Sequence, residues 1–267
     1  MTQADDFFAR GWVAFPHDPK IAAWVEAARP VANATFDDPQ QRRDWLRCGG
    51  TWFAGVNALP NDPDGGLVAS GVPPLSGAVI DFIRDELGLS GFVWDKAQVS
   101  ICFPGYPQPS EEETEAAFRY RLNRDAAHVD GLLRAKPSRQ RSLGEQHGFI
   151  LGLPLDAAPR GAAPLVVYEG SHEIMRTAFR ERFNGIDPAD WSVEDVTDAY
   201  VAARKDCFEH CRRVEVTAQP GEAYLVHRLA LHGVAPWTAD TAKQRAIAYF
   251  RPDPFPGTSP AWWLDRA

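Results

Sequence analysis

Short apolar segments separated by turns fill the chain from about residue 97 onward, and this pattern most limits the possible fold. Residues 97–103 alternate apolar and polar side chains, while residues 147–155, 163–168, 222–232 and 245–250 are largely apolar. Each segment is typical of a β-strand, and proline or glycine residues stand between them. Such a series predicts a closed or double-sheet β core of the jelly-roll type.

The first third of the chain has a mainly helical pattern. Residues 3–10 predict a short helix, and residues 76–87 repeat apolar side chains at helical spacing. Another helix is expected to begin at Pro19 and to stop before Pro30, because proline fits the first helical turn but not the helix interior. Residues 193–210 predict the longest helix. We expect these helices to pack outside the β core.

No linker, internal repeat or low-complexity tract divides the 267 residues. We therefore predict one domain, residues 1–267, with a helix-rich part at about 1–95 and a β-helix core at about 96–252. Fifteen phenylalanines and nine tryptophans can fill a sizeable core of this kind. The expected fold class is mainly β with flanking helices.

The charge and cysteine content limit the partners and the compartment. A net charge of −8 and a pI near 5.4 argue against binding to nucleic acid or to an anionic membrane. No apolar run approaches the roughly 20 residues of a membrane span, and no signal-peptide pattern opens the sequence. Four cysteines form no dense framework, which predicts a reducing, cytoplasmic location.

His128 and Asp130 are the first candidate metal ligands. On an extended strand, residues two apart point to the same side. An imidazole and a carboxylate are two of the three ligands in a 2-His-1-carboxylate site, which holds non-haem Fe(II) and leaves positions open for substrate and oxygen. In a chain with 7 histidines, however, roughly 0.6 such pairs are expected by chance, so a third ligand is needed.

Residues 222–232 offer two histidines, His227 and His232, for that third position. They are five apart, so on an unbroken strand they face opposite sides and only one readily faces the metal. We predict His232, because it precedes Gly233, where the backbone can approach a bound group closely. Arg245 follows on the next strand, within hairpin distance, and its guanidinium can bind a carboxylate through two hydrogen bonds.

The order of these residues resembles that of the Fe(II)/2-oxoglutarate-dependent oxygenases, and specifically of the phytanoyl-CoA dioxygenase family. The shared order is a His-x-Asp pair, a distal His-Gly and then an arginine. Three further segments are similar to this family: residues 8–16 resemble its first strand, residues 164–172 its strand ending in Gly-Ser-His, and residues 221–233 its distal motif. The resemblance covers nearly the whole chain.

The resemblance implies a double-stranded β-helix in which His128, Asp130 and His232 hold Fe(II). It implies that the co-substrate 2-oxoglutarate chelates the iron and that Arg245 binds its C5 carboxylate. Molecular oxygen and a small-molecule substrate complete the reaction, which would form succinate and carbon dioxide while oxidising a substrate C–H bond. Because Asp130 is present, hydroxylation or a related oxidation is expected rather than halogenation.

The chain departs from the family at two positions. The family often has a small hydroxyl residue two positions after the arginine, where this chain has Ile247. A second partner for the co-substrate carboxylate is therefore expected from Gln98, Ser100 or Tyr249. The family also tends to have asparagine shortly after the distal His-Gly, where this chain has Trp237, which would reshape the substrate side of the pocket.

Other residues have a structural and a functional interpretation. The basic run at residues 134–141 is a solvated loop, or a lid whose Arg134 grips an anionic substrate. His227 is a core residue or lies beside the substrate, and His172 is expected to be structural. The remaining group shares one face of a predicted helix and could be packed or bind zinc: Cys207, His210 and Cys211.

Two other functions stay open on the sequence alone. The first is a metal-binding cupin-like enzyme that does not use 2-oxoglutarate, for which Arg245 would be dispensable. The second is a non-catalytic sensor that keeps the fold and the metal. The release of succinate in the presence of Fe(II), 2-oxoglutarate and oxygen would distinguish the proposed oxygenase from the sensor.

Overall fold

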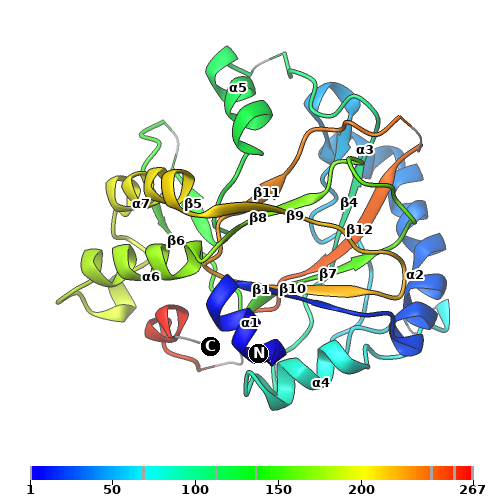
Figure 1. Ribbon diagram of the computed structural model, residues 1–267, viewed down its shortest axis with the longest axis horizontal. Coiled ribbons are helices and arrows are strands. Elements are labelled where there is room, and N and C mark those ends of the chain that lie inside the picture. The colour runs from blue at the N-terminus through cyan, green and yellow to red at the C-terminus, as the bar shows by residue number, and fades with distance from the viewer. Residues whose placement is uncertain are drawn as a thin grey trace.

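The computed structural model describes residues 2–67, 70–111, 113–135, 137–240, 243–254 and 257–265. Three antiparallel sheets form its centre (Figure 1). Their strands are β1 (Trp12–Phe15), β2 (Leu46–Arg47), β3 (Trp52–Phe53), β4 (Gln98–Cys102), β5 (Leu132–Arg134), β6 (Arg141–Leu143), β7 (Phe149–Pro154), β8 (Leu165–Glu169), β9 (Arg212–Val216), β10 (Ala223–His227), β11 (His232–Val234) and β12 (Arg245–Phe250).

A large and a small sheet face each other across an apolar interior. The large sheet has the order β1-β10-β7-β12-β4-β3-β2, the small sheet β11-β8-β9, and β5 pairs with β6 in a separate hairpin. Leu165 and Val167 of the small sheet belong to the same buried cluster as Val226, Ile247 and Tyr249 of the large sheet. The prediction of a double-sheet, jelly-roll core is therefore confirmed.

Helices cover the outer faces of both sheets (Figure 1). α2 and α4 pack against the large sheet, whereas α6 and α7 pack against the small one. The helices are α1 (Gln3–Arg10), α2 (Pro19–Asp37), α3 (Pro39–Trp45), α4 (Ala78–Asp85), α5 (Glu115–Arg124), α6 (Ser171–Arg182) and α7 (Thr197–His210), with 3-10 turns η1 (Cys48–Gly50), η3 (Pro188–Asp190) and η4 (Pro260–Leu264). Within the described part of the chain, no helix combines the length and the apolarity needed to span a bilayer.

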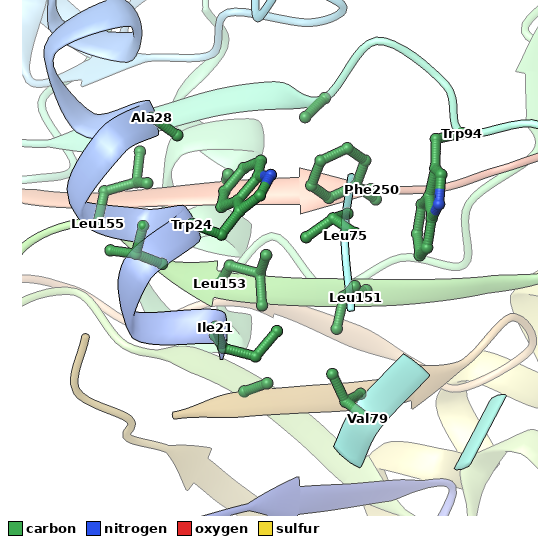
Figure 2. Close-up of a cluster of buried hydrophobic side chains, with 14 of the residues drawn as sticks. Ile21, Trp24, Ala28, Leu75, Val79, Trp94, Leu151, Leu153, Leu155 and Phe250 are labelled. Carbon is green, nitrogen blue, oxygen red and sulfur yellow. The ribbon is translucent and has the colours of Figure 1, made fainter. Parts of the chain in front are cut away.

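The largest apolar cluster lies between α2 and the outer face of the large sheet (Figure 2). Ile21, Trp24 and Ala28 recur at helical spacing on α2 and point toward Leu151 and Leu153 of β7. These side chains are almost completely buried. The large sheet therefore has its outer face packed by helices, which leaves its inner face to line the interior.

The helix that begins at Pro19 does not stop before Pro30, so that prediction is wrong. α2 continues to Asp37 with Pro30 inside it. Ala28 and Ala32 are both buried on the sheet side, while Pro30 is exposed, so the hydrogen bond that proline cannot make is lost on the solvent side. α2 is also longer than the helix predicted at residues 193–210, which begins only at Thr197.

Residues 222–232 do not form one strand, which corrects the argument used to choose His232. β10 ends at His227, a turn follows in which the Ala230 N–H donates to the His227 carbonyl at 2.8 Å, and β11 begins at His232 in the other sheet. β11 pairs with β8, whereas β12 pairs with β4 and β7. His232 and Arg245 are therefore on opposing sheets and not on a hairpin.

Candidate metal centre

His128, Asp130 and His232 lie together where the segment carrying His128 bridges to β11. One ligand atom from each lies within 4.8 Å of the others. The His128 Nε2 atom is 3.2 Å from Asp130 Oδ1, and the His232 Nε2 atom is 3.7 Å from Asp130 Oδ2. Two ligand atoms bound to one ion at about 2.1 Å and at right angles are about 3 Å apart. The three side chains are therefore close to the spacing that a single ion requires.

The backbone explains why two distant histidines meet. His128 and His232 form an isolated antiparallel bridge in which the His128 N–H donates at 2.8 Å and the His232 N–H at 3.0 Å. A Cβ atom at Gly233 would lie 2.2 Å from the Asp125 carbonyl oxygen. Gly233 is therefore needed for the approach of the segment carrying His128, not for the approach of a bound group as the sequence analysis predicted.

Both histidines present the same ring nitrogen to the centre. His128 Nδ1 lies 3.0 Å from the Ala126 carbonyl oxygen, and His232 Nδ1 lies 3.0 Å from the Ala230 carbonyl oxygen. Because a carbonyl oxygen only accepts hydrogen bonds, each Nδ1 carries the proton, which leaves the Nε2 lone pair free. This arrangement is typical of metal-bound histidines. The donor set of two imidazoles and one carboxylate fits Fe(II).

The electrostatics keep His232 and Asp130 in ligand form. Burial lowers the pKa of His232 to about 4, so its imidazole is neutral. Burial opposes ionisation of Asp130, but Arg251 and the two histidines outweigh it and hold the pKa of this carboxyl well below its usual value. Burial is the largest influence on the pKa of His128 and lowers it, but the adjacent Asp130 carboxylate and the Ala126 carbonyl together raise this pKa above its usual value. About half of the His128 side chain remains exposed, so the centre opens to solvent there.

Arg251 belongs to this centre, although the sequence analysis did not single it out. Its Nη1 atom lies 3.3 Å from Asp130 Oδ2, and its backbone N–H donates to Asp95 Oδ1 at 2.8 Å. The side chain is only 18% exposed. Arg251 directly follows β12, and an arginine at a strand end carries no motif that could have revealed this contact.

Arg245 is buried in the interior with only part of its guanidinium satisfied. Its Nη2 atom donates to the Ala163 carbonyl oxygen at 2.6 Å and lies 3.4 Å from Cys102 Sγ. Arg245 is 3% exposed, and its Nε and Nη1 atoms have no hydrogen-bond partner among the described residues. A buried charge without its hydrogen bonds is unfavourable, so these two donors suit a bound anion.

The three candidates for a second carboxylate partner share the face of Arg245. In the register of β4 and β12, Arg245 lies opposite Cys102, Ile247 opposite Ser100, and Tyr249 opposite Gln98. Directly opposed residues of antiparallel strands share a face, and residues two apart do as well. Gln98, Ser100 and Tyr249 therefore line the interior together with Arg245.

His227 does not line this interior, so its prediction as a substrate contact is wrong. Tyr224 lies opposite Gly152, which lies opposite Tyr249, so the Tyr224 side chain points into the interior like that of Tyr249. His227 is three positions beyond Tyr224, an odd number, so it points to the opposite face of the large sheet. There it is fully buried against Phe7 and His172.

The other predicted residues lie at different distances from the centre. Trp237 is half-buried in a cluster with Cys102 and Ala163, which places it at the Arg245 end. Arg134 is exposed at the end of β5, and position 136 of the basic run lies outside the described residues. His172 is buried at the start of α6, with Nε2 3.0 Å from the Phe8 carbonyl oxygen, as expected for a structural residue.

The alternative zinc group does not assemble in the described part of the chain. The only set there that brings three ligand atoms together is the His128 centre. Cys207 is buried on α7 with its thiol 3.9 Å from the Ser171 carbonyl oxygen, and His210 pairs with Asp206. Cys207 is therefore packed against the start of α6, whereas His210 is exposed.

Comparison with known proteins shows a shared fold. No protein-family model and no curated protein sequence matches the chain. The crystal structure of EctD from S. alaskensis with bound Fe has a TM-score of 0.51 and 17% identity, over 99% of this chain and 82% of that one. AviO1 from Streptomyces viridochromogenes Tue57 has a TM-score of 0.51 and 14% identity, over 95% of this chain and 96% of AviO1. At this identity the likeness establishes the fold and not the activity.

Proposed function

We propose that the protein is a non-haem Fe(II)/2-oxoglutarate-dependent oxygenase that hydroxylates a small molecule, as a single domain similar to the phytanoyl-CoA dioxygenase family. The observation that carries the proposal is the convergence of His128, Asp130 and His232 on one point with both Nε2 lone pairs free. This donor set is the one that non-haem Fe(II) oxygenases use.

The unsatisfied guanidinium of Arg245 supports 2-oxoglutarate as the co-substrate. Its two unpartnered donors are buried between the sheets, where a carboxylate would restore their hydrogen bonds. His232 faces the same interior, because its cross-strand partner Val167 packs with Ile247 of β12. A second EctD structure contains 2-oxoglutarate and 5-hydroxyectoine and has a TM-score of 0.51 to this chain, at 17% identity over 99% of this chain and 83% of that one. The same fold therefore accommodates this co-substrate in another protein.

The chain's own residues would divide the work as follows. His128 and His232 would hold the metal through Nε2, and Asp130 would supply the charged oxygen, kept ionised by Arg251. Arg245 would bind the distal carboxylate and so fix the orientation of the co-substrate. Bound iron and 2-oxoglutarate supply the oxidising chemistry, with succinate and carbon dioxide as co-products.

The walls of the interior and the cysteines complete the proposal. Val167 and Ile247 present apolar side chains between the sheets, which keeps water from the interior. All four cysteines are free thiols, which supports a reducing, cytoplasmic location. The second candidate is a cupin-like metalloenzyme that does not use 2-oxoglutarate. It provides no carboxylate to accept hydrogen bonds from the unpartnered donors of Arg245.

The test is a succinate assay with a panel of metabolites. The protein loaded with Fe(II) should release succinate from 2-oxoglutarate in the presence of oxygen, and a true substrate should raise the rate. Arg245→Ala and His232→Ala should each abolish the release. Turnover of a substrate that yields no succinate and survives Arg245→Ala would establish the cupin-like alternative instead. No succinate with any metabolite, from protein that binds Fe(II), would favour the sensor.

A further inference from the structure

A tyrosine pair shares the inner face of the large sheet with Arg245, and the proposed function has not yet used it. Tyr224 and Tyr249 are 1% and 7% exposed, and the Tyr224 hydroxyl lies 3.0 Å from the Tyr249 hydroxyl. Tyr249 is four positions beyond Arg245 on β12, so both side chains point into the interior. The position between them holds Ile247, which offers no hydrogen bond.

Gly152 shows that the strands accommodate this pair. A Cβ atom at Gly152 would lie 2.1 Å from the Tyr224 ring and 2.6 Å from its hydroxyl oxygen. The Tyr224 ring therefore crosses β7 over Gly152, which has no side chain, and its hydroxyl reaches Tyr249 on the next strand, β12. A glycine in a strand interior otherwise weakens the strand, so its presence here is explained by the close approach of this ring.

The hydrogen-bond inventory of the pair leaves one donor unused. Each hydroxyl has one hydrogen to donate, but the two groups share a single hydrogen bond and have no further acceptor among the described residues. Burial raises the pKa of Tyr249, although Arg245 opposes this, so its hydroxyl stays protonated near neutral pH. The tyrosine pair thus leaves one O–H hydrogen unused, and Arg245 leaves the hydrogens of its Nε and Nη1 atoms unused, and all of these are donors.

The other two candidates fit less well. The Ser100 hydroxyl accepts a hydrogen bond from Trp52 Nε1 at 3.1 Å, on the β3 side of Arg245, and keeps its own hydrogen to donate. Its side chain is short, however, so this donor stays near the sheet backbone. Gln98 lies opposite Tyr249 but is only partly buried, so its amide can be satisfied by solvent. Tyrosine, like arginine, carries its polar group at the end of a long side chain, and the Arg245 charge acts on the pKa of Tyr249.

We propose that the Tyr249 hydroxyl, oriented by Tyr224, is the second donor to the distal carboxylate of 2-oxoglutarate bound at Arg245. This inference rests on the proposed function. Tyr249 would take the role of the small hydroxyl residue that the resembled family often has at the position of Ile247. Tyr249 contacts the co-substrate directly, and Tyr224 is a positioning residue that occupies one side of the Tyr249 oxygen and directs the free hydrogen toward Arg245.

Binding measurements without oxygen test the inference independently of turnover. The protein is loaded with Mn(II), and isothermal titration calorimetry gives the affinity for 2-oxoglutarate and for oxalate, which chelates a metal but has no distal carboxylate. Tyr249→Phe should weaken 2-oxoglutarate binding roughly ten- to a hundredfold, the value of a hydrogen bond to a charged group, and should leave oxalate binding unchanged. Tyr224→Phe should weaken it severalfold, and Ser100→Ala should have no effect.

The outcomes separate the inference from the proposed function. If the unaltered protein binds oxalate but not 2-oxoglutarate, the proposed function fails and the inference with it. If it binds 2-oxoglutarate, loses it in Arg245→Ala, and keeps its affinity in Tyr249→Phe, the inference alone is overturned. The inference is also overturned if Ser100→Ala weakens 2-oxoglutarate binding and Tyr249→Phe does not. If Tyr249→Phe also loses its affinity for oxalate, that variant is not informative and Tyr224→Phe is used instead. An unchanged affinity of Tyr224→Phe for 2-oxoglutarate would then reject the role of the tyrosine pair.

Discussion

Two buried arginines, Arg228 and Arg245, lie in different parts of the same fold and differ in how their charge is satisfied. Arg228 is 2% exposed and donates to the Trp263, Trp262 and Asp265 carbonyl oxygens at 2.9, 3.0 and 2.8 Å. Its guanidinium also lies 4.0 Å from the centre of the Trp262 ring. Arg245 is 3% exposed, yet only its Nη2 atom has hydrogen-bond partners among the residues that the structure describes.

On the proposed function, the difference separates a structural charge from one that a bound carboxylate would satisfy. The protein itself surrounds Arg228 with carbonyl oxygens and so fixes η4 against the turn after β10. Burial and the nearby Arg176 lower the pKa of Arg228 to about 9, which reflects how little negative charge surrounds it. At Arg245 the fold leaves two donors open, which costs stability unless something else repays it. We interpret this loss of stability as support for the proposed binding of a carboxylate at Arg245.

Replacing Arg245 should have the largest effect on function and little effect on stability. Arg245→Met removes the open donors and keeps an apolar stem of similar length, so unfolding in urea should change by less than about 1 kcal/mol or show a gain. The dissociation constant for 2-oxoglutarate should rise by more than roughly a hundredfold. Equal losses of stability and binding would show that Arg245 is structural after all.

Arg228→Met should give the opposite result. It leaves the carbonyl oxygens around η4 without donors, so the free energy of unfolding should fall by about 3 kcal/mol. The affinity of the remaining folded protein for 2-oxoglutarate should stay within about twofold of the unaltered chain. Urea unfolding and calorimetry on one preparation measure both quantities. A large loss of affinity with normal stability would remove the distinction between the two arginines.

Asp95 provides a smaller and pH-dependent test of a buried charge near the metal centre. Burial raises the pKa of Asp95 to about 6, above the value of about 3.9 in an unfolded chain. Between these values the folded state binds more protons, so this group's contribution to stability falls as pH rises through that window. Asp95→Asn keeps an acceptor for the Arg251 N–H and removes the charge.

The expected result is a pH-dependent difference between the two proteins. The free energy of unfolding of Asp95→Asn minus that of the unaltered chain should be larger at pH 7.5 than at pH 4.5, by about 1–2 kcal/mol. Urea denaturation at both pH values measures the difference. A constant difference across this range would show that Asp95 is not a strained charge.

The fold class was predictable because strand pattern and turns are local signals, whereas the way the strands are shared between sheets was not. The turn between His227 and His232 depends on the burial of Arg228 against a segment more than thirty positions away. No periodicity within residues 222–232 contains that information. The same holds for Pro30, because its tolerance depends on which side of α2 faces solvent.

The candidate site was predictable to the extent that motifs name residues. His128, Asp130, His232 and Arg245 follow a recognisable order, and the structure brings the first three together. Tyr249 was one of three candidates, but its partner Tyr224 and Arg251 could not be found in this way, because their contacts depend on strand register and side-chain length. Gly152 was a readable signal in principle, as a glycine within an apolar strand indicates a close approach.

The most direct test of the central claim is an anaerobic titration of the purified protein with Fe(II) and then 2-oxoglutarate, followed by visible absorption. The account predicts one Fe(II) for each chain, and a charge-transfer band that appears when the 2-oxo acid chelates the iron. The band should be absent in His232→Ala, and in Arg245→Met it should need at least a hundredfold more 2-oxoglutarate. Iron binding without the band, or a band that persists in His232→Ala, would contradict the account.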